Sequence, residues 1–219
     1  TVYANLKKVI TFLLPVNGGE SMSLIIAVLF GLVLPITPLQ ILWVNMLSSV
    51  ALAMALAFEP PEKGVMARPP RPASAPIMSR FVLWRVMLVS VLFTIGIFGQ
   101  FEMALALGAD LDVARTMAVN TLVSMEVFYL FSVRYRHGAS ATAEGTRGTP
   151  AVLIALAVVL ALQALLTYAP PLHALFETAA LSLWQLASCA AAGMLLLAVL
   201  DVDKRVAAFW KRDPKGDTA

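Results

Sequence analysis

An isolated carboxylate, Glu20, lies in a long apolar stretch and is the residue best placed to do chemistry. It is the only charged residue between Lys8 and Glu59. A charged side chain in a membrane span costs about 2.5 to 3.5 kcal/mol, so such residues mark ion or proton pathways. Asn17 precedes Glu20 by three residues, which places both side chains on one helix face. The pair predicts a polar site for an ion or a proton.

A second polar cluster follows in the next apolar stretch, at a similar depth. Asn45, Ser48 and Ser49 are spaced i, i+3 and i+4, so they share one face of a helix. If the two helices turn these faces toward each other, carboxylate, amide and hydroxyl oxygens surround one point. Hard cations prefer such oxygen ligands. Asparagine also forms interhelical hydrogen bonds and serine favours close helix packing, so a structural role for this cluster stays open.

Glu126 is the other carboxylate deep within an apolar stretch. We expect it slightly toward the cytoplasmic side of Glu20 and near the same site; the alternative is a protonated acid bonded to a neighbouring helix. Pro15 and the glycines that follow it are expected to interrupt the helix and to free carbonyls for cation binding. No catalytic or cofactor-binding residue is predicted. The predicted metal ligands are Asn17, Glu20, Asn45, Ser48, Ser49 and Glu126.

The composition of the chain indicates which class of protein positions these residues. Hydrophobic residues make up 60% of the 219 residues, charged residues make up 13%, and the mean hydropathy is +0.84. Such a chain is too apolar to cover itself with a water-compatible surface. Its apolar stretches are continuous and lack polar alternation, which favours helices over a β-barrel. The predicted fold is all-α, an integral membrane bundle.

Six stretches are long enough to cross a membrane, because a spanning helix needs about 20 apolar residues. Proline-rich residues 59–80 are expected to form a stiff cytoplasmic loop, and residues 201–219 a cytoplasmic tail. Residues 1–219 are therefore interpreted as one membrane domain. The predicted spans are 9–33, 39–58, 81–102, 113–133, 151–169 and 178–200.

Positive charge is distributed unevenly between the two sides of these spans. If six spans alternate in direction, 15 of the 16 Lys and Arg residues fall on one side of the membrane, and Arg115 falls on the other. The side with the excess of positive residues is normally cytoplasmic, so this bias places both termini in the cytoplasm of a multi-pass plasma-membrane or inner-membrane protein. The net charge of +3 therefore indicates topology and not nucleic-acid binding. Anionic membrane lipid is the expected partner of the exposed basic residues.

Several segments resemble the C-terminal membrane region of P-type cation-transporting ATPases, in the branch of the calcium and sodium/potassium pumps. The resemblance covers nearly the whole chain and implies that the six spans are the family's fifth to tenth. It also implies that Asn17, Glu20, Asn45, Ser48 and Glu126 occupy positions that supply cation ligands in calcium pumps. The segments are Thr1-Val-Tyr-Ala-Asn-Leu-Lys-Lys8, Asn17-Gly-Gly-Glu20, Pro38-Leu-Gln-Ile-Leu-Trp-Val-Asn45, Ala57-Phe-Glu-Pro-Pro61, Met66-Ala-Arg-Pro-Pro-Arg71, Thr116-Met-Ala118 and Leu200-Asp-Val-Asp-Lys-Arg205.

The sequence departs from this family at two points. Ser49 stands where calcium pumps have an aspartate of the ion sites, so two calcium ions bound together are not expected. One ion, a monovalent ion or proton-coupled transport through Glu20 stay open. The family's phosphorylation motif, Asp-Lys-Thr-Gly-Thr, and its nucleotide domain have no counterpart, so this chain alone is not expected to hydrolyse ATP.

Since the first residue is Thr1, we expect a piece of a longer chain, a processed product or a split-gene product.

The resemblance predicts the transport half of an ATP-driven cation pump. Its expected partners are an inorganic cation, membrane lipid, and the actuator, phosphorylation and nucleotide domains of the same pump, which would supply the Mg-ATP chemistry. Two alternatives stay open. In the first, the chain is a membrane subunit or regulatory fragment without catalytic activity. In the second, it is a passive channel or carrier that uses the same carboxylates.

Overall fold

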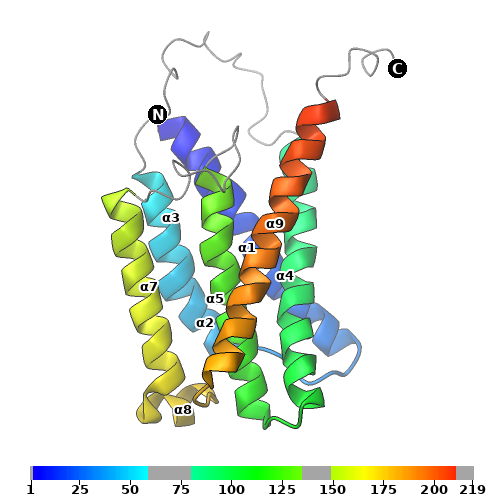
Figure 1. The fold of residues 1–219 in the computed structure, drawn as a ribbon, viewed down its shortest axis with the longest axis vertical. Helices are drawn as coiled ribbons and strands as arrows, with labels where there is room; N and C mark the ends of the chain where they lie inside the picture. The colour runs from blue at the N-terminus through cyan, green and yellow to red at the C-terminus, as the bar shows by residue number, and fades with distance from the viewer. Residues whose placement is uncertain (1, 59–79, 135–148, 211–219) are drawn as a thin grey trace.

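A computed structural model describes residues 2–58, 80–134 and 149–210, and within these ranges the chain forms helices and no strand. The prediction of an all-helical protein is confirmed. Five of the helices are long and apolar enough to cross a membrane (Figure 1). They are α1 (Val2–Leu29), α4 (Arg80–Ala106), α5 (Leu111–Arg134), α7 (Pro150–Tyr168) and α9 (Leu183–Trp210).

The stretch between α1 and α4 is helical in three consecutive segments. α2 (Pro38–Val44) passes directly into a π-helix, η1 (Asn45–Ser49), which passes into α3 (Val50–Ala57). Within η1 the Val50 N–H donates to the Asn45 carbonyl, an i→i+5 bond. Such π-helical turns are rare and frequently occur at functional sites. The expected α-helical winding of the second polar cluster is therefore wrong.

Local sequence signals explain where α1 ends. Gly31 has a φ of +63°, which glycine adopts without a steric penalty. Its N–H donates to the Val28 carbonyl at 3.3 Å, and the Leu32 N–H donates to the Ala27 carbonyl at 2.8 Å. These two bonds form a Schellman motif, which terminates a helix. The helix consequently ends before the predicted limit of the first span at residue 33.

The start of α9 is set by a capping box. The Ser182 hydroxyl accepts from the Gln185 N–H at 3.4 Å, and Gln185 Oε1 accepts from the Ser182 N–H at 2.7 Å. The helix begins at Leu183 and not at the expected residue 178. Between α7 and α9, the short helix α8 (Pro170–Phe176) lies at one end of the bundle (Figure 1).

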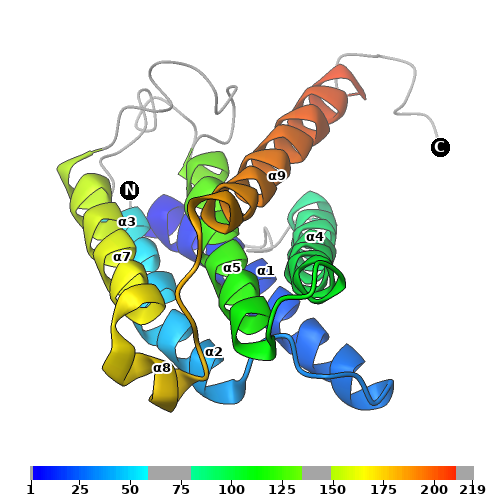
Figure 2. The ribbon, with the colours of Figure 1, turned by 60° about the horizontal axis from the view of Figure 1, so that its bottom comes forward.

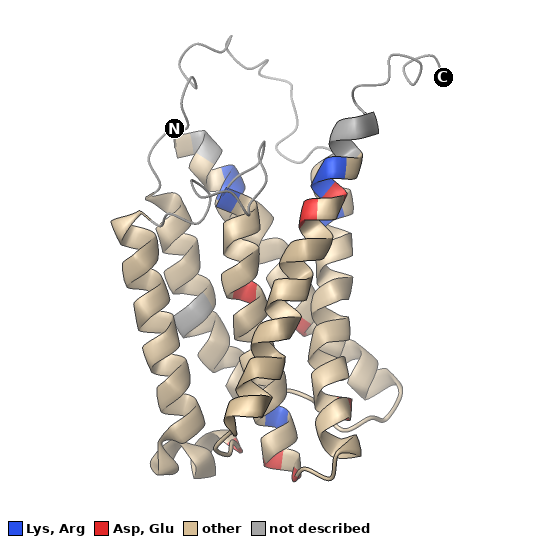
Figure 3. Cartoon of the chain, viewed as in Figure 1, with Lys and Arg blue, Asp and Glu red and all other residues tan. Residues whose placement is uncertain are grey.

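The helices form a bundle in which α5 lies between α7 and α4, as Figure 1 and Figure 2 both show. α1 packs along α4, α5 packs along α9, and α3 contacts both α1 and α7. α1 begins and α9 ends at the same end of the bundle. Among the described residues, Lys and Arg gather at that end (Figure 3). One basic residue lies at the opposite end, near the start of α5, the helix that contains Arg115.

Two glycines allow α1 and α4 to approach closely. A Cβ atom added at Gly18 would lie 2.3 Å from Ser90 Oγ, and one added at Gly19 would lie 2.5 Å from Phe93 Cβ. Helix contacts in membranes are enriched in small residues for this reason. α1 is a continuous helix across Pro15 and both glycines. The predicted interruption of the first span is therefore wrong, and the glycines serve close packing.

Gly19→Ala is expected to lower the unfolding temperature, because α1 must move away from Phe93 to make room for the new methyl group. Overpacking of this kind costs about 1 to 3 kcal/mol. Gly99→Ala is the matched control on α4, since no described atom lies within 4 Å of its added Cβ. Thermal unfolding of the purified variants in detergent measures both effects. Equal stability of the two variants would contradict the close contact.

Candidate cation site

Glu20 of α1 contacts Asn45, the first residue of η1. Asn45 Nδ2 donates to Glu20 Oε2 at 2.8 Å and to the Ile41 carbonyl at 3.2 Å. Glu20 is only 4% exposed, although it carries an ionisable group. The structure thus brings together one predicted ligand from each of the two polar clusters.

The last residue of η1 contacts the second buried carboxylate. Ser49 Oγ donates to Glu126 Oε1 at 2.8 Å, and both residues are buried. Glu126 lies on α5, whereas Glu20 lies on α1. The five-residue π-helix therefore contacts one carboxylate through its first residue and the other through its last. Both predicted acids are connected to the same short element.

One carboxylate oxygen of this site has unused hydrogen-bonding capacity. Glu20 Oε1 is buried and has no hydrogen-bond partner among the described residues, while Oε2 accepts from Asn45. Leaving a buried acceptor unsatisfied costs about 1 to 3 kcal/mol, and more for a charged group. A bound cation or a proton at Oε1 would remove this cost. The geometry of the site is thus suited to one further ligand at Glu20.

Asn17 and Ser48 are the two remaining predicted ligands. Asn17 lies on α1 with an exposed side chain. The Ser48 side chain lies outside the described part of the structure, although its backbone belongs to η1. The described site therefore consists of Glu20, Asn45, Ser49 and Glu126.

The backbone carbonyls near Pro15 are occupied by hydroxyl groups from other helices. Proline has no N–H, so the Thr11 carbonyl loses its intrahelical donor. Tyr129 OH donates to this carbonyl at 2.8 Å, and Ser90 Oγ donates to the Pro15 carbonyl at 3.1 Å. The expectation that these carbonyls are free to bind a cation is wrong. The sequence signals that Thr11 needs a donor, but it does not identify Tyr129.

The donor set of the site favours hard cations. Among the described residues, no three His, Cys, Asp or Glu side chains gather as a metal centre. The site instead combines two carboxylates with an amide and a hydroxyl group. Calcium, magnesium and other hard cations prefer oxygen ligands, whereas thiolate and imidazole groups select softer transition metals.

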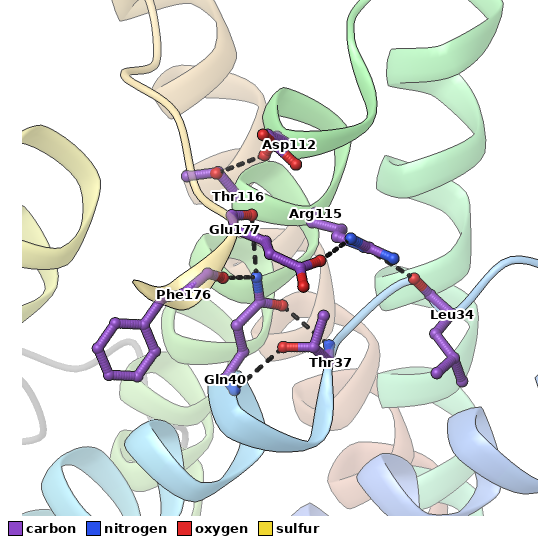
Figure 4. Close-up of polar contacts among 8 residues, drawn as sticks. All are labelled: Leu34, Thr37, Gln40, Asp112, Arg115, Thr116, Phe176 and Glu177. Atoms are coloured by element: carbon purple, nitrogen blue, oxygen red, sulfur yellow. Dashed lines mark hydrogen bonds and ion pairs between the residues drawn. The ribbon is translucent and has the colours of Figure 1, made fainter. Parts of the chain in front are cut away.

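Gln40 fixes the helix that leads into η1. It is fully buried, its Nε2 donates to the Phe176 carbonyl at 2.6 Å, and its Oε1 accepts from the Thr37 N–H at 3.0 Å (Figure 4). Thr37 Oγ1 accepts from the Gln40 N–H, which completes a capping box at the start of α2. Gln40 therefore ties the first turn of α2 to the end of α8.

Arg115 of α5 joins the same end of the bundle. It forms an ion pair with Glu177, and its Nε donates to the Leu34 carbonyl at 3.4 Å (Figure 4). The neighbouring Thr116 hydroxyl accepts from the Ala179 N–H at 2.8 Å. α2, which leads into η1, is thus tied to the end of α8, and α5, which carries Glu126, is tied to the residues that follow α8.

Gln40→Met is expected to destabilise the protein, since it removes the donor to the Phe176 carbonyl and the acceptor for the Thr37 N–H. Each buried group left unsatisfied costs about 1 to 3 kcal/mol. Gln163→Met is the matched control, because Gln163 is also buried but its Nε2 has no partner among the described residues. Thermal unfolding compares the two variants. A loss at Gln163 as large as that at Gln40 would contradict the role of the Gln40 bonds.

The chain is similar to the C-terminal part of known cation-transporting ATPases. A family model described as cation-transporting ATPase, C-terminus, matches residues 33–206. The cation-transporting ATPase pma1 of Synechocystis is 42% identical over 194 residues, which cover 86% of this chain and 21% of the relative. The probable cation-transporting ATPase F of Mycobacterium tuberculosis is 41% identical over 184 residues, covering 81% and 20%. The calcium-transporting ATPase of Bacillus subtilis is 34% identical over 187 residues, covering 83% and 20%. The chain thus spans about a fifth of the length of these curated relatives.

Proposed function

This chain belongs to the family of C-terminal membrane regions of P-type cation-transporting ATPases, and we propose that it supplies the cation-binding side chains of such a pump. Glu20, Asn45, Ser49 and Glu126 bind the transported cation, with Asn17 and Ser48 completing the ligand set. The observation that carries this proposal is the buried Glu20 Oε1, which has no partner among the described residues. A cation there satisfies the oxygen and compensates its charge.

Cation binding replaces hydrogen bonds within the site. Asn45 and Ser49 donate to the two carboxylates in the present arrangement. As ligands they turn their own oxygens toward the ion. Because both residues lie on η1, a change in the winding of this π-helix moves both ligands together. Phosphorylation elsewhere in the pump would drive such a change and so alter the cation affinity and the side of access.

We infer that the membrane domain has six spans, of which α2, η1 and α3 together form the second. Pro38 to Ala57 is continuous helical chain of mostly apolar residues, close to the length of about 20 that a span needs. An even number of spans agrees with α1 beginning and α9 ending at the same end of the bundle. The basic residues at that end favour the cytoplasm for both termini, in a plasma or inner membrane, with anionic lipid around them.

The remainder of the pump completes both the site and the reaction. Asn17 is exposed in this chain, although polar side chains within a span usually face protein or water. Spans from the rest of the pump would cover it. The actuator, phosphorylation and nucleotide domains would supply the Mg-ATP chemistry, since this chain spans about a fifth of its relatives.

A cation panel on the full-length pump tests the proposal. Phosphoenzyme formation from Mg-ATP and ATP hydrolysis are measured against calcium, manganese, sodium, potassium and pH. We expect one of these cations to stimulate both reactions. Failure of every cation to stimulate either would contradict a pump. Ion flux through the purified chain in liposomes without ATP would instead support a passive channel or carrier.

A further inference from the structure

Tyr129 of α5 fills the gap that Pro15 leaves in the hydrogen-bond ladder of α1. In an α-helix the N–H at position 15 would donate to the Thr11 carbonyl, but proline has no N–H. Tyr129 OH donates to this carbonyl at 2.8 Å instead. A bond within one helix is therefore replaced by a bond between two helices.

Aromatic neighbours hold the ring of Tyr129 in a fixed position. Tyr129 is fully buried, stacks on Phe12 with ring centroids 5.8 Å apart, and meets Phe93 edge-on at 6.1 Å. Phe12 belongs to α1 and Phe93 belongs to α4. A ring confined in this way gives its hydroxyl a fixed direction. The bond to Thr11 consequently constrains the position of α1 relative to α5.

The contact lies between the N-terminal turns of α1 and the cation site. Tyr129 follows Glu126 by three residues, which places the two side chains on one face of α5. Thr11 and Pro15 precede Glu20 on α1. Helices bend preferentially at proline, where a ladder bond is missing. A bend of α1 at this point would displace the Thr11 carbonyl and thereby act on α5 through the bond to Tyr129.

We propose that Tyr129 is a positioning residue of the cation site, which couples bending of α1 at Pro15 to the placement of Glu126. The inference rests on the proposed function, because Glu20 and Glu126 are cation ligands there. Tyr129 does not bind the cation itself. It acts through Thr11, so that movement of the N-terminal turns of α1 reaches both carboxylates together.

A double-mutant cycle in the full-length pump tests this coupling. Tyr129→Phe keeps the ring and removes the donor, whereas Pro15→Ala restores an N–H for the Thr11 carbonyl. We expect Tyr129→Phe to raise the cation concentration for half-maximal phosphorylation by roughly 2- to 10-fold, the effect of one hydrogen bond. In the Pro15→Ala background the shift should fall below about twofold, because the Thr11 carbonyl then has a donor within α1 and no longer depends on Tyr129. The difference between the two shifts isolates the interaction between the two positions. Equal shifts in both backgrounds, or no shift in either, would overturn the proposal.

Two further measurements separate a positioning role from a merely structural one. Tyr168→Phe is the matched control, because its hydroxyl also donates to a carbonyl, that of Leu181, but at the end of α7. It should leave the cation affinity unchanged in both backgrounds.

Thermal unfolding of the four proteins of the cycle reports the hydrogen bond independently of transport. If the effects of the two substitutions are non-additive on the unfolding temperature but additive on the cation affinity, the hydrogen bond serves stability alone. Tyr129 is then structural, and the positioning role is overturned. Failure of the proposed function is recognised separately, by a Glu20→Gln pump that retains wild-type cation dependence.

Discussion

Glu20→Ala is expected to abolish cation-dependent phosphorylation of the full-length pump at ordinary cation concentrations. Glu20 supplies a buried carboxylate whose Oε1 has no partner among the described residues. Removing one partner of a buried charge pair costs about 2 to 5 kcal/mol. Since about 1.4 kcal/mol is tenfold, the cation affinity should fall by at least about 30-fold. Phosphoenzyme formation from Mg-ATP, titrated with the activating cation, measures this loss.

Glu20→Gln separates the charge of this side chain from its shape. Glutamine keeps an oxygen that accepts from Asn45 Nδ2, so the contact between α1 and η1 is retained. We expect most of the affinity loss to persist, because the cation then lacks a full negative charge opposite it. Glu102→Gln is the matched control, since Glu102 is exposed near the end of α4 and should leave the cation dependence unchanged. Wild-type cation dependence in Glu20→Gln would contradict the proposed site.

The polar residues of the site are predictable because they interrupt apolar stretches. Glu20 and Asn45 stand out in this way, and the structure joins them at 2.8 Å. The contact between Ser49 and Glu126 is harder to predict, since the two residues are 77 positions apart. The π-helix that brings Ser49 into place leaves no signal in composition or spacing. It depends on the packing of η1 against α5 and α7, which only the folded chain provides.

Pro15 and the glycines after it show why local helix signals mislead within a membrane. These residues break helices in water, and the sequence therefore predicts an interrupted span with free carbonyls. In a membrane protein, neighbouring helices satisfy the freed backbone groups instead. Tyr129 supplies the donor for the freed Thr11 carbonyl, and the glycines allow α4 close enough for Ser90 to donate to the Pro15 carbonyl. Both partners lie far from Pro15 in sequence, so local patterning gives no access to them.

Ser49→Asp is expected to shift the selectivity of the pump toward divalent cations. Ser49 Oγ lies 2.8 Å from Glu126 Oε1, so an aspartate at this position places a second carboxylate against the first. Two carboxylates this close repel each other unless a proton or a cation lies between them. A divalent cation compensates both charges, whereas a monovalent cation compensates only one. We therefore expect the ratio of divalent to monovalent affinity to rise by at least about tenfold, which corresponds to about 1.4 kcal/mol.

Ser49→Asn provides the control for this substitution, because it has nearly the size of aspartate but no charge. Thermal unfolding without divalent cations should rank Ser49→Asp below Ser49→Asn, since only the former places like charges together. A divalent cation at about 100 times its dissociation constant would then stabilise Ser49→Asp by about 2.7 kcal/mol. Phosphorylation titrated with calcium and with sodium measures the selectivity. If both variants discriminate equally between these ions, position 49 is not a ligand, and Glu126 binds Ser49 for helix packing alone.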